Sequence, residues 1–313
     1  MIVVLGMIMA LSVLLLGFHR KARTHLSTAV RIQQSQQCHN YAYTGLSHAM
    51  AIVQSLDTAS DGSKKRFGTE RKLPVSQGTC TFRLQPLEGR INVNRFKQPN
   101  GQLNRPIIDQ FLRLIDLVNH DLPLDQRLGY GLVPAIIDWT DNDHEPTILE
   151  FIKGKNTGVE SAYYQRRDRP TTCSNAPLQA CAELLLIRGM SPAAFAVLEE
   201  HITVKGDDKI NLNYASKQVL RSFSLDMTES LAQAIVDRRQ RKPFTSLDDI
   251  GTLPGLTDPI RQALSRQATV ASTNQYFLVR ARGDIGPVHR RIRALVKRNT
   301  SAKTVDILEY QEL

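Results

Sequence analysis

The chain has 313 residues, 42% of them hydrophobic, and a formal net charge of +10 at pH 7. This length can bury one large core or two ordinary ones, and the apolar content argues against a disordered protein. The positive charge would suit a nucleic acid, an anionic membrane surface or an acidic protein. Basic residues are spread along the chain with acidic residues near several of them, so solvated helix and strand surfaces explain most of the excess.

The N-terminus is apolar. Residues 1–18 contain no charged side chain, and the sequence then changes abruptly to HRKAR at 19–23. A run of this length is near the lower limit of the about 17 to 25 residues that span a bilayer as a helix. Apolar residues recur at helical spacing through about residue 56. These patterns predict one long helix, with a transmembrane or filament-core segment at 1–18 and an amphipathic continuation at 19–57.

Two parts of the chain resemble each other. EGRINVNR at 88–95 matches DDKINLNY at 207–214, and PAIID at 134–138 matches QAIVD at 233–237. Six further positions recur at a constant offset of 66 residues: Pro177 and Pro243, Leu178 and Phe244, Glu183 and Asp249, Leu184 and Ile250, Gly189 and Gly255, Met190 and Leu256. Because the order is the same in both copies, we predict a duplicated helical unit with an Asn-rich turn as a cap and glycine as a helix stop.

Strand-like segments lie on both sides of this helical region. Alternating, β-branched and aromatic residues predict strands at 79–87, 276–285, 288–298 and 304–313. The pattern indicates an α+β fold in which a long N-terminal helix packs on an antiparallel sheet and a large helical insert interrupts that sheet. The expected boundaries are 58–94 with 271–313 for the sheet body, and 95–270 for the insert.

The first copy of the repeat contains an acidic loop. It has about 33 more residues than the second copy between Asp138 and Pro177. Carboxylates at alternate positions can surround Ca²⁺, which takes six to eight oxygen ligands, although the spacing is not that of an EF-hand. A solvated acidic loop is the alternative. The candidate ligands are Asp138, Asp141, Asp143, Glu145 and Glu160.

The four cysteines, Cys38, Cys80, Cys173 and Cys181, lack metal-binding spacing. Their even number fits an oxidising compartment with two disulfides. Cys173 with Cys181 would close a loop, and Cys38 with Cys80 would tie the N-terminal helix to the body. Four buried thiols are the alternative, and the sequence does not decide the connectivity.

The second copy of the repeat also resembles helix-hairpin-helix DNA-binding modules. Such modules bind phosphates through backbone N–H groups of a hairpin near a helix N-terminus. Here Asp226 and Asp258 stand at the hairpin positions and would oppose a phosphate. DNA binding or DNA uptake is therefore the second hypothesis. Scattered histidines, without GxSxG or HExxH, indicate that the chain is not an enzyme.

Several motifs in order are similar to one family. They are an apolar start without a glutamate near its fifth position, INVN and INLN, IIDWTDNDHEP at 136–146, GVESAYY at 158–164, APLQACAELLLIRGM at 176–190, and YFLVRARGDI at 276–285. With these motifs the chain resembles the K-type minor pseudopilin of type II secretion systems (general secretion pathway protein K) over nearly its whole length.

The resemblance implies a fold and a role. The fold would be a pilin-like sheet with a helical insert that carries a duplicated helix-hairpin-helix/SAM-like unit. The protein would be anchored in the bacterial inner membrane by a single pass, with its C-terminal body in the periplasm. It would cap the tip of the pseudopilus and help initiate its assembly for protein export. Main pseudopilins pair with the next subunit through an acidic residue that this family lacks, and here no Asp or Glu precedes residue 57.

The same resemblance implies partners and a metal. The partners would be the I- and J-type minor pseudopilins, and the secretin or secreted cargo could also contact the chain; nucleic acid is not expected. Calcium would bind in the insert, with Asp141, Asp143 and Glu160 as the preferred ligands and Asp138 and Glu145 next.

The N-terminus departs from the family pattern. The basic leader and its processing glycine are not evident, and Gly6 would leave too short an apolar run. We expect residue 1 to lie a few positions inside the family's mature start. The basic cluster at 19–23 also opposes the predicted orientation by the positive-inside rule, which assisted insertion would have to override.

Overall fold

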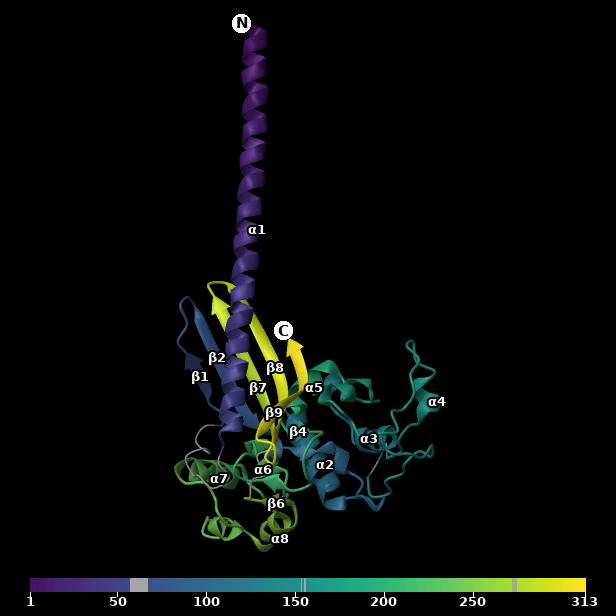
Figure 1. Ribbon diagram of the computed structural model, residues 1–313. Helices are drawn as coiled ribbons and strands as arrows, with labels where there is room; N and C mark the ends of the chain where they lie inside the picture. The colour runs from purple at the N-terminus through teal and green to yellow at the C-terminus, as the bar shows by residue number, and fades with distance from the viewer. Residues whose placement is uncertain (57–66, 153, 155, 272–274) are drawn as a thin grey trace.

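A long helix and a five-stranded sheet form the frame of the protein (Figure 1). The computed structural model describes residues 1–56, 67–152, 154, 156–271 and 275–313. Helix α1 (Ile2–Gln54) has 53 residues and projects far beyond the body. Its first part is exposed, and its last turns lie against the sheet. The predicted long N-terminal helix is confirmed.

The sheet is antiparallel throughout, with strand order β1-β2-β7-β8-β9. Strands β2 and β7 are central neighbours although the insert separates them in sequence. The prediction of an antiparallel sheet that is interrupted by a helical region is confirmed. The strands are β1 (Glu70–Leu73), β2 (Thr79–Pro86), β7 (Tyr276–Ile285), β8 (Val288–Asn299) and β9 (Thr304–Glu312).

One apolar face of the sheet packs on the last third of α1. Along β2 the buried residues alternate, as expected for a strand with one covered face. The core of this contact contains Ala42, Leu46, Ala49 and Val53 from α1, and Phe82, Leu84, Phe277, Val279, Ala281, Ile292, Ala294 and Val296 from the strands.

Glycine lets the helix approach the sheet closely at one position. A Cβ atom on Gly283 of β7 would lie 2.1 Å from the backbone oxygen of Cys38 and 2.8 Å from the Cβ of Tyr41. Gly45 of α1 faces the same region, where an added Cβ would lie 3.2 Å from the Cβ of Ala281. Gly283 is therefore required by space rather than by backbone conformation, whereas a side chain at Gly45 would need its neighbours to shift by a few tenths of an ångström.

The insert between β2 and β7 contains α2 to α8 and has its own hydrophobic core. Its helices are α2 (Arg105–Asn119), α3 (Leu132–Thr140), α4 (Ser161–Tyr164), α5 (Pro192–Leu198), α6 (Lys217–Arg221), α7 (Glu229–Arg241) and α8 (Asp258–Gln267). Short 3-10 helices are η2 (Leu87–Gly89), η3 (Val93–Arg95), η4 (Leu124–Gln126), η5 (Cys181–Leu186) and η6 (Leu247–Ile250). Short strands are β3 (Ile91–Asn92), β4 (Ile202–Thr203), β5 (Ile210–Asn211) and β6 (Ala268–Thr269).

Two details of the strands differ from the sequence-based expectation. Strand β1 was not predicted, because ERKL carries three charged residues and its side chains are exposed or half-buried. Strand β3 falls in the range assigned to the sheet body, yet it pairs in parallel with β4 of the insert. Residues 58–66 of that assigned range lie outside the described residues.

The two INxN motifs make the same contacts. In the first copy, the side-chain amide of Asn94 accepts a hydrogen bond from the Leu178 backbone N–H at 2.9 Å. Its nitrogen donates to the backbone oxygens of Leu178 and Val204, both at 2.9 Å. One side chain thus joins three segments that are far apart in the chain.

Asn213 does the same in the second copy. It accepts from the Phe244 N–H at 2.8 Å and donates to the backbone oxygens of Phe244 and Val270. Its partners lie 66 residues after those of Asn94, at the offset found in the sequence. The short parallel pairs β3 with β4 and β5 with β6 also correspond. The repeat therefore preserves a hydrogen-bonded clasp around each asparagine.

We predict that Asn213→Ala lowers the free energy of unfolding by about 2 to 3 kcal/mol, because it leaves partly buried backbone groups without partners. Asn94→Ala should have a similar cost. Urea unfolding of the full chain in detergent would measure both effects. Asn40→Ala, on the exposed face of α1, is the matched control and should change stability by less than about 0.5 kcal/mol. Equal effects at all three positions would contradict the clasp.

Candidate functional site

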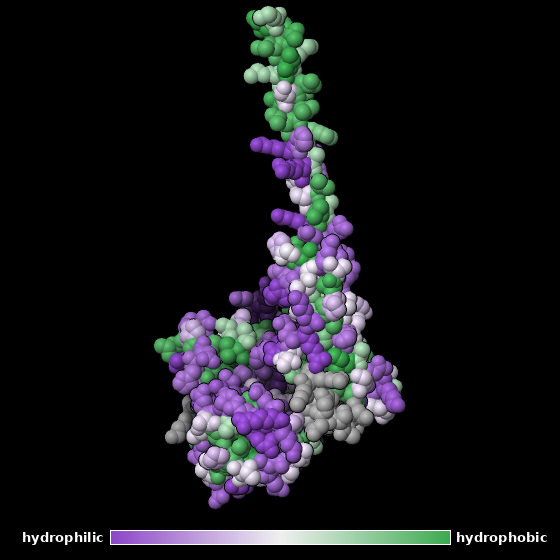
Figure 2. Space-filling model, turned by 90° about the vertical axis from the view of Figure 1, so that its left-hand side faces the viewer, coloured by the Kyte–Doolittle hydropathy of each residue, from purple (hydrophilic) through white to green (hydrophobic). Residues whose placement is uncertain are grey.

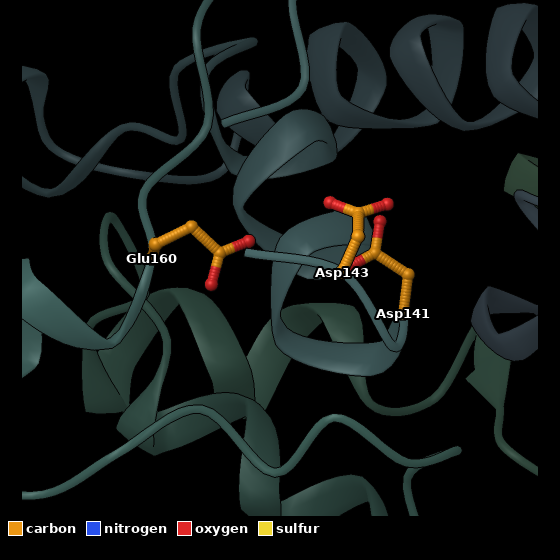
Figure 3. A group of neighbouring side chains, drawn as sticks. All are labelled: Asp141, Asp143 and Glu160. Carbon is orange, nitrogen blue, oxygen red and sulfur yellow. The ribbon is translucent and has the colours of Figure 1, made fainter. Parts of the chain in front are cut away.

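The acidic loop begins where α3 ends. Asp141 is the C-terminal cap of α3, and its backbone N–H still donates to Ile137 at 2.9 Å. The chain then turns, passes an isolated bridge between Ile148 and Thr157, and reaches Glu160, which precedes α4. Figure 3 shows Glu160 approaching the Asp141 and Asp143 pair from a different segment of the chain. Two ends of one long loop thus meet at a single point.

Three of the predicted ligands come together there. One carboxylate oxygen from each of Asp141, Asp143 and Glu160 can be chosen so that all lie within 4.8 Å of one another. Oxygens that share a Ca²⁺ ion at about 2.4 Å each can be at most about 4.8 Å apart. The spacing of these carboxylates is therefore compatible with a common cation.

Several oxygens at this point are buried without a hydrogen bond. Among the described residues, Oδ1 of Asp141 and both carboxylate oxygens of Glu160 have no hydrogen-bond partner. Glu160 is only 8% exposed. Burial raises the pKa of the Glu160 carboxyl, and the negative charge of Asp141 raises it further. Buried carboxylates normally require a hydrogen bond, a counter-charge or a metal, so the donor set fits a hard divalent cation such as calcium.

Asp138 supports the loop from inside the protein. It is fully buried, and its Oδ1 accepts a hydrogen bond from the Thr147 backbone N–H at 2.8 Å. A Cβ atom on Gly158 would lie 1.9 Å from Oδ2 of Asp138, so the backbone at Gly158 passes directly over this carboxylate. Burial raises the pKa of Asp138 to about 6. It is adjacent to the three-carboxylate group and fixes the start of the loop.

Glu145 is not part of this group. It is exposed, and its backbone N–H donates to Oδ1 of Asp143 at 3.0 Å. The contribution of this position is therefore a backbone contact that holds the Asp143 side chain.

Two residues near the group were missed by the sequence analysis. Lys97 donates to Oδ2 of Asp141 at 2.5 Å and lies 3.7 Å from Oδ2 of Asp143. The side-chain oxygen of Asn175 is buried and has no hydrogen-bond partner among the described residues. The backbone N–H of Asn175 donates to the backbone oxygen of Trp139 at 3.0 Å. An amide oxygen is a normal calcium ligand. Neither residue belongs to an acidic pattern, so carboxylate spacing could not have indicated them.

The four cysteines are free thiols in this structure, and neither predicted disulfide is formed. Cys38 and Cys80 lie where α1 meets the sheet, and their thiols donate to the backbone oxygens of Val288 and Tyr41. Burial raises the pKa of Cys173 and that of Cys181 to about 11. Such thiols pack as small apolar groups and react slowly.

The exposed part of α1 is the second candidate functional feature. It is long and apolar enough to cross a membrane by length and composition, and none of its most apolar stretch is buried in the protein. Figure 2 shows the apolar end of the helix, followed by a hydrophilic zone before the body. Isolated apolar side chains are commonly exposed to water, but a continuous apolar run of this size requires a lipid or protein environment.

Two family models match the chain, at residues 89–207 and at 210–271, and both describe the type II secretion system (T2SS), protein K. Together they cover more than half of the chain. The chain belongs to the type II secretion system protein K family. The boundary between the two models lies just before the INLN motif, so each contains one copy of the asparagine clasp.

Two named relatives support the same assignment. The type II secretion system protein K of Klebsiella pneumoniae is 23% identical over 228 residues, which are 71% of this chain and 66% of the relative. The protein K of Aeromonas hydrophila is 24% identical over 250 residues, or 74% of this chain and 70% of the relative. The match thus spans about two thirds of the length of these curated relatives.

A solved structure shares the fold. A chain in the crystal structure of the GspK-GspI-GspJ complex from the enterotoxigenic Escherichia coli type 2 secretion system aligns with a TM-score of 0.66. The alignment covers 90% of this chain and 99% of that chain, at 20% identity. The architecture of helix, sheet and insert is therefore that of a known family fold.

The raised pKa of Asp138 predicts a pH dependence of stability in the metal-free protein. The folded state holds this proton more tightly than the unfolded chain, so its stabilising contribution is complete below about pH 4 and is lost as the pH rises through about 6. In chelator, the free energy of unfolding should fall between about pH 5 and pH 7 more steeply in the wild type than in Asp138→Asn. Urea unfolding at the two pH values would measure the difference.

Asp168→Asn, an exposed position outside the three-carboxylate group, is the control for this measurement. It should leave the pH dependence of the wild type unchanged. Parallel pH profiles for the wild type and Asp138→Asn would show that the buried carboxyl is not the cause.

Proposed function

We propose that the chain is the minor pseudopilin that caps the tip of the type II secretion pseudopilus and helps initiate its assembly for protein export across the outer membrane. Membership of the protein K family is the observation that carries this proposal. The apolar, exposed N-terminal part of α1 supports it, because a filament subunit needs a helix that can leave the bilayer and pack among partner helices. No acidic residue precedes position 57, which suits a subunit with nothing above it.

The proposed partners are the I- and J-type minor pseudopilins. A protein of the same fold was solved in a complex named for GspK, GspI and GspJ. We also propose that residues 1–18 cross the inner membrane once and that the C-terminal body lies in the periplasm. There the insert would face the secretin or secreted cargo, while the five-stranded sheet and the end of α1 would be the pilin-like body.

The proposed work of the chain is mechanical rather than enzymatic. The two asparagine clasps support the interpretation of the insert as a duplicated helix-hairpin-helix/SAM-like unit. Asp258 stands in the first turn of α8 and Asp226 in the turn before α7. Acidic side chains at these positions occupy the electropositive helix ends where a phosphate would bind, so we retain the scaffold and do not propose DNA binding.

We further propose that calcium binds in the acidic loop. Asp141, Asp143 and Glu160 would hold the ion, with Asp138 supporting the loop and Asn175 supplying a neutral oxygen. The ion would supply positive charge to carboxylates that otherwise repel one another. The loop joins the end of α3 to α4, so neutralising it would make that part of the insert rigid.

Association with the I- and J-type pseudopilins of the same organism tests the proposed role. We expect both to co-elute with the full chain when the three are co-expressed and purified in detergent through a tag on this chain. A variant with Leu14→Arg, which places a charge inside the apolar run, should reduce membrane insertion and recovery of the complex. If neither partner co-elutes with the correctly folded wild type, the proposed assembly role is wrong.

Calcium binding is tested by titration calorimetry on the full chain in detergent. We expect the wild type to bind calcium and Asp141→Ala/Asp143→Ala to lose binding at least tenfold, because two of the three carboxylates are removed. Asp207→Ala/Asp208→Ala removes the same charge from an exposed turn elsewhere and should bind like the wild type. Calcium should also protect residues 138–177 from proteolysis; equal cleavage with calcium and with chelator would contradict a stabilising ion.

A further inference from the structure

The two edges of the five-stranded sheet differ in length and in charge. Figure 1 shows β1 and β9 at opposite sides of the sheet. Strand β1 has four residues, three of them charged. Strand β9 has nine residues and contains no lysine, arginine or proline. Proteins commonly prevent an edge strand from pairing with another chain by making it short or by placing lysine or proline on it. By these criteria β1 is protected and β9 is open.

The backbone of β9 has hydrogen-bonding groups that point away from the sheet. Arg291 and Leu313 exchange both backbone hydrogen bonds, at 3.1 and 2.9 Å. Such exchanges recur at every second residue of an antiparallel pair, so the N–H and C=O groups of Tyr310 and Glu312 point outward. Within the described parts of the chain, β9 makes no backbone–backbone hydrogen bond to any element except β8. This edge can therefore accept a further strand.

Apolar side chains accompany these backbone groups. Ile307, Leu308 and Tyr310 are 42%, 44% and 44% exposed, and Leu313 is 57% exposed. Four such residues within one short stretch form a continuous apolar strip, which is typical of a protein-binding surface. The register of β8 with β9 shifts between Leu295 and Val296, beside Leu308. Because a bulge interrupts pairing, we expect an added strand to pair with residues 309–313.

One side of β9 lies against α1. Tyr310 is opposite Ala294, which belongs to the core between the sheet and α1. On the same side, Oε2 of Glu312 is 3.6 Å from Nδ1 of His39 in α1. Tyr43 follows His39 by one helical turn and is therefore its neighbour on the helix surface. Tyr43 is 54% exposed, so it extends the apolar strip from β9 onto α1.

The other side of β9 borders a cavity of about 280 Å³ between the sheet and the insert. Glu309 and Gln311 line it from β9, Leu295 lines it from β8, and Lys205 lines it from the insert. Alternate residues of a strand point to opposite faces. An added strand would thus send every second side chain toward this cavity and the others toward α1. Backbone pairing at a sheet edge, combined with pockets for alternate side chains, is a common mode of peptide recognition.

The charges of β9 indicate which strand fits. They are all acidic: Asp306, Glu309 and Glu312. A second copy of β9 would bring three more carboxylates to the same edge, and like charges on opposed strands are destabilising. An apolar strand that carries lysine or arginine is complementary instead. It must also lie beside α1, and in the filament proposed above the neighbour of α1 is another pilin-like subunit.

We propose that the open edge of β9 is the docking site for an extended apolar and basic strand of a neighbouring minor pseudopilin, which joins the sheet at residues 309–313. The inference rests on the assembly role proposed above and identifies the surface of this chain that serves it. Backbone hydrogen bonds to Tyr310 and Glu312 supply affinity. The strip that includes Tyr43 and the cavity beneath Glu309 select the side chains of the partner.

Hydrogen–deuterium exchange tests whether the edge gains a strand. The full chain in detergent is compared alone and with the full-length I- or J-type pseudopilin. We expect a peptide that covers 309–313 to exchange at least about tenfold more slowly in the complex with one of them, because outward N–H groups become hydrogen-bonded. A peptide that covers β1 is the internal reference and should not change.

A pair of lysines on the edge tests the same site by substitution. Ile307→Lys/Tyr310→Lys should bind that partner at least about tenfold more weakly in surface plasmon resonance, because lysine blocks edge pairing and repels a basic strand. Leu124→Lys/Leu225→Lys adds the same charge at leucines that are 80% and 88% exposed and should bind like the wild type. Equal melting temperatures would show that both variants are folded.

The possible results separate the docking site from the assembly role. If a partner binds, but neither the exchange at 309–313 nor the affinity of Ile307→Lys/Tyr310→Lys changes, the docking site is wrong while the assembly role stands. If 309–313 become protected in the chain alone as its concentration rises, the occupant is a second copy and the proposal is also overturned. If neither partner binds the folded wild type, both the assembly role and the docking site are wrong.

Discussion

The close contact between α1 and the sheet is the constraint on which the rest of the protein depends. Helix α1 projects far beyond the body, so only its last turns contact the sheet. This contact attaches the exposed part of the helix to the body. Small residues make this possible: Ala42, Ala49, Gly45 and Gly283 bring the helix backbone against β7 at near-minimal separation. A contact of this kind is rigid because almost any larger side chain would separate its two layers.

Charged residues connect the insert to the face of the sheet that lies opposite α1. Arg293 of β8 pairs with Glu199 at 2.9 Å, and Arg280 of β7 pairs with Glu200 at 2.5 Å. Arg90, buried next to β3, donates to the backbone oxygen of Glu199 at 2.9 Å. Removing one member of such a group leaves the others with desolvated charge. Ion pairs and hydrogen bonds of charged groups therefore fix how the insert lies on the sheet, whereas close packing of small residues fixes how α1 lies on it.

Patterns of apolar spacing and of repetition predicted most of this architecture. The uncharged run at 1–18 and the helical spacing of apolar residues that follows it predicted one long helix. The repeat was visible because each asparagine side chain bonds to two backbone segments, Leu178 and Val204 in the first copy and Phe244 and Val270 in the second, and the two segments are equally far apart in sequence in both copies. Strand β1 could not be recognised, since its polar residues are determined by its position at the sheet edge.

The acidic loop shows why the candidate site was only partly predictable. Carboxylates at alternate positions identified Asp141 and Asp143, and the family motif supplied Glu160. Lys97 contacts Asp141, and Asn175 contacts Trp139 and His144, only because η3 and the segment before η5 fold against the end of α3, which no local pattern encodes. The loop also buries carboxylate oxygens that have no partner of their own, an arrangement that costs free energy in an isolated domain. Such a cost is tolerable where a positive charge can offset it, and Lys97 supplies such a charge at Asp141.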